Sequence, residues 1–168
     1  MATDLTTLRP ARLEDAAALA AAHEEAWRYA YQGIIPHLAL SKMIARRGPR
    51  WWQHRLGRHM PALLLRFDDE VAGYVTYGLS RMRGTPYGGE LFELYIRPVY
   101  QGAGFGGTLF RAARRALAQR HVDGLIIWAL SDNEPACEFY LHLGGQPVSE
   151  GIETFGRVAL RKVAFAWT

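Results

Sequence analysis

The sequence LYIRPVYQGAGFGGT, residues 94–108, joins an apolar segment to an amphipathic one. Residues 90–96 carry apolar side chains on both alternating faces, which is typical of a strand covered on both sides. From Phe105 to Leu117 apolar residues recur at helical spacing, with arginines mostly on the opposite face. Glycines between the two elements would let the backbone approach an anion, whose charge the helix N-terminus would stabilise. Residues 101–108 are therefore predicted to form an anion-binding loop between a strand and a helix.

The rest of the chain also alternates between strand and helix patterns. Runs rich in β-formers predict strands over residues 5–9, 62–67, 71–77, 125–130 and 158–167. Helix propensity and apolar spacing predict helices over residues 15–30, 38–43, 51–56 and 134–143. This order predicts the α/β class, with one mixed sheet and helices on both of its faces. Because no linker or repeat interrupts it, residues 1–168 are predicted to form a single domain.

Composition narrows the class of protein. Twenty Lys and Arg against sixteen Asp and Glu give a net charge of +4, which suits an anionic ligand without requiring nucleic acid. Cys137 is the only cysteine, so an intrachain disulfide is excluded, and the six histidines lack metal-ligand spacing, so no metal is expected. The chain shows no leader-like start and no apolar run of about 18 residues. We therefore expect a cytoplasmic protein that does not associate with a membrane.

Two motifs carry a family resemblance. Residues 94–106 resemble the acetyl-CoA signature of the GNAT superfamily of N-acetyltransferases, in which a strand ending in proline is followed by Gln/Arg-x-x-Gly-x-Gly/Ala. Residues 133–145, NEPACEFYLHLGG, resemble the second motif of that superfamily. Residues 8–11 with Asp15 resemble its first strand and helix start. Because the motifs occur in the expected order and separation, the resemblance covers nearly the whole chain.

The resemblance implies a GNAT-like, mostly antiparallel sheet in which strands 90–96 and 125–130 splay apart around the pantetheine of acetyl-CoA. Backbone groups of Tyr95 and Ile96 would hold the pantetheine amides. Gln101 replaces the commoner arginine of the signature, so backbone amides must carry more of the phosphate recognition. The residues implied in cofactor binding are Tyr95, Ile96, Gln101, Gly102, Ala103, Gly104, Phe105, Gly106, Gly107, Thr108, Asn133 and Phe139.

Acyl transfer to an amine needs an acceptor for the amine proton and an acid for the departing thiolate. The resemblance implies that Tyr140 is the acid, because it follows Asn133 by seven residues; the alternative is that it packs in the core. For the base, Glu90 is preferred because it precedes Gln101 by eleven residues, the spacing of the catalytic glutamate in histone-type members. Glu93 is the alternative, and regular alternation would place the two on opposite faces. A salt bridge or acceptor recognition stays open for either.

The acceptor is expected to be a primary amine of a small molecule or peptide, acetylated directly in a ternary complex. Trp27 and Tyr31 are candidates for the acceptor pocket, and we expect a homodimer. One alternative function is an inactive acyl-CoA-binding regulatory module. Another is a nucleic-acid-binding or ribosome-associated domain built on the arginines and tryptophans of residues 46–58, although such a segment is more typical of a helix with a solvated face.

Overall fold

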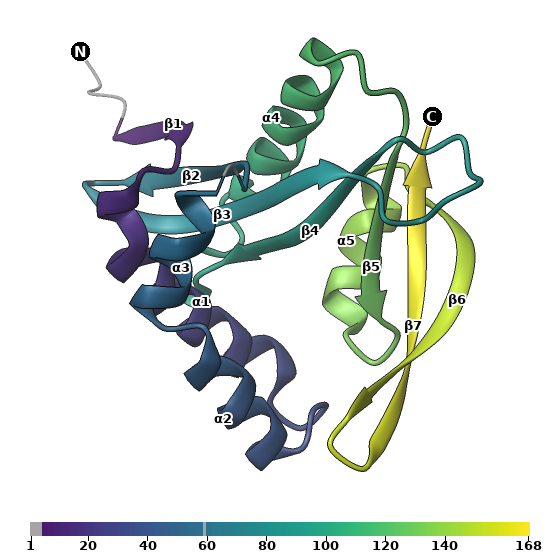
Figure 1. Cartoon of the computed structure of the whole chain (residues 1–168), viewed down its shortest axis with the longest axis horizontal. Helices are drawn as coiled ribbons and strands as arrows, with labels where there is room; N and C mark the ends of the chain where they lie inside the picture. Colours follow the sequence, from purple (N-terminus) through teal and green to yellow (C-terminus); the bar gives the residue numbers. More distant parts are fainter. Residues whose placement is uncertain (1–4, 59) are drawn as a thin grey trace.

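The computed structural model describes residues 5–58 and 60–168 (Figure 1). Its elements are β1 (Thr6–Pro10), α1 (Ala16–Tyr31), α2 (His37–Arg46), α3 (Pro49–Leu56), β2 (Ala62–Phe67), β3 (Glu70–Leu79), β4 (Gly89–Ile96), α4 (Phe105–Gln119), β5 (Leu125–Leu130), α5 (Glu134–His142), β6 (Gln146–Phe155) and β7 (Val158–Trp167). Short 3-10 turns occupy Leu13–Asp15 and Pro98–Tyr100. The predicted strands and helices are all present in these residues, with ends that differ by a few positions.

The strands form one sheet in the order β1-β2-β3-β4-β5-β7-β6. Neighbours are antiparallel except β4 and β5, which run parallel and pair only over Gly89–Leu91 with Leu125–Ile127. Beyond these pairs the two strands separate, as their diverging arrows in Figure 1 show. The expected mixed, mostly antiparallel and splayed sheet is thereby confirmed.

Helices cover both faces of the sheet because the central strands are apolar on both sides. On β2, Leu63 and Leu65 join the cluster that includes α4 and α5, whereas Leu64 between them joins the cluster with α1 and α3. Leu64 and Leu65 are fully buried, and each such side chain stabilises the fold by roughly 1.5–3 kcal/mol. None of the helices in the described residues is both long and apolar enough to cross a membrane.

A β-bulge interrupts β4 in the middle of the sheet. Tyr77 of β3 pairs with Leu91, and the preceding Thr76 pairs with Glu93, so Phe92 is an extra residue on β4. The expectation that Glu90 and Glu93 lie on opposite faces is therefore wrong. The inserted residue resets the alternation and brings both carboxylates to the same side of the strand.

The edge strand β6 is absent from the sequence prediction. Most of its side chains are half-buried or exposed, so QPVSEGIETF has no apolar alternation to reveal it. It is held by pairing with β7 and by the turn at Gly156, whose φ of +62° favours glycine.

Candidate active site

A groove of about 680 Å³ lies where β4 and β5 separate; we call it the loop groove. One wall is formed by the end of β4, the start of α4 and the loop of residues 101–104 between them, which we call the glycine loop. The other wall is formed by α5. The residues that line it are Ala26, Tyr29, Ala30, Ile34, Leu94, Tyr95, Ile96, Tyr100, Gln101, Gly102, Gly104, Phe105, Gly106, Gly107, Asn133, Pro135, Ala136, Phe139 and Tyr140. All residues implied in cofactor binding lie here except Ala103 and Thr108, whose hydroxyl donates to the Gly104 carbonyl at 3.2 Å.

Gly102, Gly104, Gly106 and Gly107 line this groove with backbone atoms alone, because glycine has no side chain. Gly102 and Gly104 have φ of +84° and +82°, the left-handed region that favours glycine, and Gly104 caps α4. The first N–H groups of α4 have no partner within the helix, and the helix dipole adds positive potential there. A Cβ at Gly106 would lie 3.0 Å from the Phe139 ring, so this glycine allows α4 and α5 to approach closely. The loop therefore offers an anion-binding end to the groove.

Asn133 and Tyr140 lie at the inner end of the loop groove. Asn133 caps α5, since its side-chain oxygen accepts from the Ala136 N–H at 3.4 Å. Tyr140 is buried against Phe165 and Trp167, and burial raises the pKa of its phenol. The hydroxyl therefore stays protonated at neutral pH. A small cavity of about 30 Å³, which Tyr140 and Asn133 share with Glu93 and Tyr95, lies directly beside it.

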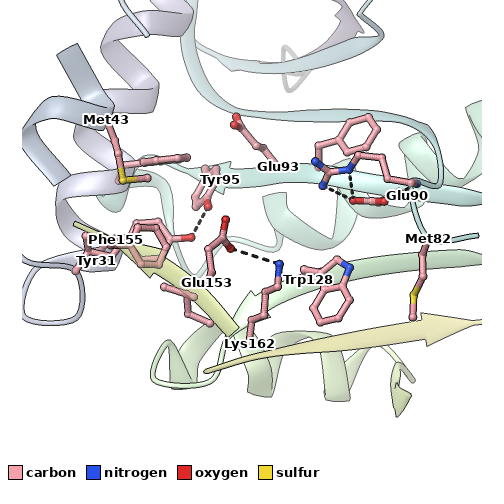
Figure 2. A pocket seen from close by; sticks show the side chains of 15 residues that line it. Tyr31, Met43, Met82, Glu90, Glu93, Tyr95, Trp128, Glu153, Phe155 and Lys162 are labelled. Carbon is pink, nitrogen blue, oxygen red and sulfur yellow. Dashed lines mark hydrogen bonds and ion pairs between the residues drawn. The ribbon is translucent and has the colours of Figure 1, made fainter. Parts of the chain in front are cut away.

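A second cavity of about 500 Å³ opens on the other side of β4; we call it the aromatic cavity (Figure 2). Aromatic side chains from α1, β4, β5 and β6 surround a central set of charged ones. The lining residues are Trp27, Tyr31, Ile35, Met43, Arg81, Met82, Glu90, Phe92, Glu93, Tyr95, Trp128, Leu130, Glu153, Phe155 and Lys162. The acceptor candidates Trp27 and Tyr31 both belong to it, and Tyr95 borders both cavities.

Glu90 is buried at the right-hand end of this cavity in Figure 2 and is held by Arg81. The Arg81 backbone N–H donates to one carboxylate oxygen at 3.0 Å, and its Nε and Nη2 donate to the other at 3.2 and 2.6 Å. The side chain is thus in the ion pair that the sequence left open. Three donors of Arg81 thus fix the position of the Glu90 side chain.

Glu93, three residues further along β4, is held by different partners. One carboxylate oxygen accepts from Nη1 of Arg47, and the other accepts from the Tyr74 hydroxyl at 3.0 Å. Arg47 follows α2 and lies over the Trp51 ring at 4.0 Å from its centroid. Burial, followed by the Glu93 charge, raises the pKa of Tyr74. Glu93 also lines the small cavity beside Tyr140, which Glu90 does not.

The chain is similar to known proteins over most of its length. A family model described as "Acetyltransferase (GNAT) family" matches residues 19–144. The chain belongs to this family. A Bacillus subtilis protein, "Uncharacterized N-acetyltransferase YuaI", is 27% identical over 165 residues, which cover 97% of this chain and 93% of that protein.

Solved structures of other acetyltransferases share the fold. The PaiA N-acetyltransferase from Thermoplasma acidophilum, determined in complex with coenzyme A, has a TM-score of 0.76 at 18% identity and covers 94% of this chain and 97% of its own. YncA from Salmonella typhimurium, determined with its cofactor acetyl-CoA, has a TM-score of 0.70 at 21% identity and covers 97% of this chain and 93% of its own. Seven strands with a splay between β4 and β5 are thus the GNAT fold.

In this acetyltransferase, two tyrosines connect the aromatic cavity to the loop groove. The hydroxyls of Tyr31 and Tyr95 form a hydrogen bond, drawn as a dashed line in Figure 2. Burial is the largest influence on Tyr31 and raises its pKa to about 12. Both phenols therefore stay protonated at neutral pH. One of the two hydroxyl protons forms the hydrogen bond between them, and the other is not used in that bond.

Several charged residues of the site were missed by the sequence analysis. Glu153 of β6 and Lys162 of β7 form an ion pair of 3.7 Å in the middle of the aromatic cavity (Figure 2), and Lys162 also lies over Trp128. Arg81 belongs to a loop that carries no motif, and Arg47 stands out in the sequence only as one arginine of segment 46–58. Each of these basic residues enters the site through an ion pair with a glutamate. Spacing in the sequence does not reveal such pairs.

The aromatic residues of segment 46–58 are not presented for stacking on bases. Trp52 is fully buried between Tyr74 and His23, and Trp51 lies beneath Arg47 and Arg55. Within residues 5–58 and 60–168, no group of three or more His, Cys, Asp or Glu side chains is arranged to hold a metal ion.

Proposed function

We propose that this GNAT acetyltransferase moves an acetyl group from acetyl-CoA directly to a primary amine of a small molecule or peptide in a ternary complex. The observation that carries the proposal is that the loop groove and the aromatic cavity share Tyr95 as a wall. A cosubstrate in the first and an acceptor in the second would therefore meet at β4. Acetyl-CoA is the cosubstrate of the family. The loop groove suits this extended molecule, and the anion-binding end of the groove suits the phosphates.

The cosubstrate would be bound mainly by backbone groups. Beyond Leu91, β4 has no ladder partner on its β5 side, so the pantetheine amides can pair with Tyr95 and Ile96 as an added strand would. The phosphates would lie against the N–H groups from Gly102 to Gly107 at the start of α4. Together these contacts hold the thioester near Asn133 and Tyr140.

Chemistry at the junction requires two proton movements. As the amine nitrogen bonds to the acetyl carbon and the carbon–sulfur bond breaks, the thiolate needs a proton, which we assign to the Tyr140 hydroxyl. The acceptor ammonium must first lose a proton to a base. We assign that role to Glu93 in preference to Glu90. Glu93 lines both the aromatic cavity and the small cavity beside Tyr140, and that cavity is about the size of one water molecule.

Two isosteric substitutions distinguish the proposed roles of Glu93 and Glu90. Glu93→Gln should lower kcat at least about tenfold and remove the acidic limb of the pH–rate profile, because the amide cannot accept the proton. Glu90→Gln should chiefly raise the acceptor KM and keep the limb, because Glu90 shapes the cavity through Arg81. Steady-state kinetics between pH 6 and 9 check this. A Glu93→Gln enzyme with the wild-type profile would exclude Glu93 as the base.

The acceptor class is tested by an unbiased screen. Purified protein and acetyl-CoA are incubated with amines, amino acids, aminoglycosides and peptides, and free thiol is measured. Release of CoA that depends on one amine, with the acetylated product seen by mass spectrometry, is the expected result. Tight CoA binding without turnover on any amine would instead favour the inactive binding module. The homodimer, the cytoplasmic location and the single domain over 1–168 stay predictions, and light scattering tests the first.

A further inference from the structure

The anion-binding end of the loop groove lacks the cation that the family signature places at position 101. Gln101 turns inward, where its Nε2 donates to the Ile96 carbonyl at 3.1 Å. Arg97, the nearest arginine before the loop, is bound to Glu25 at 2.8 Å and to Glu70 at 3.3 Å. Neither side chain is therefore placed to meet a phosphate.

Arg111 lies in the second turn of α4, four residues after Gly107. Helical side chains lean toward the N-terminus of their helix, so Arg111 extends back over Gly107. A Cβ built on Gly107 would lie 3.0 Å from Nη1 of Arg111, so the absence of a side chain at 107 is what makes room for the guanidinium. Gly107 lines the loop groove and Arg111 does not, so the guanidinium lies next to a lining residue of the anion-binding end.

The charge environment of Arg111 differs from that of its neighbour Arg114 on α4. Among the residues that the structure describes, Arg111 has no carboxylate within the 4.0 Å of an ion pair, whereas Arg114 on the same helix donates to the Thr168 carbonyl. The exposed guanidinium therefore lies beside Gly107, near the free N–H groups at the start of α4, with no carboxylate of the described residues bound to it.

We propose that Arg111 binds the pyrophosphate of CoA and replaces the cation that Gln101 does not supply. The inference rests on the proposed function, since it assumes that the loop groove binds CoA. Arg111 makes charge-assisted, bidentate contacts with the phosphate oxygens, in addition to the backbone N–H groups of the loop. It contributes to cosubstrate affinity and not to the acyl-transfer step.

The test compares three ligands that differ in their phosphates. Calorimetry measures CoA and dephospho-CoA, which keeps the pyrophosphate but lacks the 3′-phosphate, and NMR titration measures pantetheine, which has no phosphate. Arg111→Gln should weaken CoA and dephospho-CoA equally, by about tenfold, and leave pantetheine unchanged. Arg111→Lys should recover part of the loss. Arg115→Gln, which removes an equally exposed arginine one turn further along α4, is the matched control and should change CoA affinity less than twofold.

The outcomes that overturn the proposal are distinct from failure of the proposed function. Unchanged CoA affinity in Arg111→Gln, an equal loss for pantetheine, or an unaffected dephospho-CoA would each exclude a pyrophosphate contact. Thermal melting of each variant without ligand shows whether it is folded. Failure of the wild-type protein to bind CoA at all would instead remove the proposed function itself.

Discussion

CoA is expected to bind the Gly104→Asp variant at least about a hundredfold more weakly than the wild type, a loss of roughly 2.7 kcal/mol. Gly104 caps α4, and no atom lies within 4 Å of the position that its Cβ would take. In the proposed complex this space belongs to the phosphates, so the new carboxylate would both occupy it and repel them. Calorimetry with CoA measures the change.

Two controls separate charge from backbone strain. Gly84→Asp introduces the same side chain at a φ of +74°, also in open space, but in the loop between β3 and β4 away from the groove. It should leave CoA affinity unchanged. Gly104→Ala adds only the Cβ and should lose less than Gly104→Asp. A folded Gly104→Asp protein with wild-type CoA affinity would refute phosphate binding at this loop.

Turnover of the Tyr140→Phe variant is expected to fall roughly ten- to a thousandfold, with little change in acetyl-CoA affinity. Only the hydroxyl is removed, and the ring contacts with Phe165 and Trp167 are kept. Burial raises the pKa of Tyr140, so in the proposed mechanism the wild-type phenol would hold its proton until the thiolate departs. The measurements are kcat at saturating substrates and the dissociation constant of acetyl-CoA.

Tyr77→Phe serves as the matched control for this loss. Tyr77 is buried in the same apolar cluster, but it lines neither cavity. Its replacement should leave turnover within about twofold of the wild type. If Tyr140→Phe turned over normally, the tyrosine would be a core residue and water would have to protonate the thiolate.

The order of strands and helices was predictable from the sequence because local patterns carry it. The strand ending at Pro98, the glycines after it and the amphipathic α4 are contiguous, so residues 94–117 reveal both the elements and the groove between them. The motifs around Gly104 and Asn133, which resemble those of acetyltransferases, also predicted that the site lies where these elements meet. The strand β6 lacks such a pattern, because its stability depends on a partner strand and not on its own apolar face.

The charged side of the site could not be predicted in the same way. The bulge at Phe92 arises from how β3 and β4 pair, and nothing in the run from Glu90 to Glu93 marks an extra residue. The partners of these glutamates come from distant segments: Arg47 is 46 positions away from Glu93 along the chain. Such contacts depend on the tertiary arrangement of α2, β3 and β4, which spacing in one sequence does not encode.

The short pairing of β4 with β5 also bears on edge-to-edge aggregation of strands. Past Leu91, one side of β4 is an open strand edge, and exposed edges are templates for aggregation. This edge lies in the middle of the sheet, between β3 and the separated β5, and not at its rim. A strand from another molecule would bring its own sheet with it and could not enter, whereas a single extended chain can. The unpaired N–H and C=O groups of β4 are therefore accessible to a narrow, extended ligand but not to the edge of another sheet.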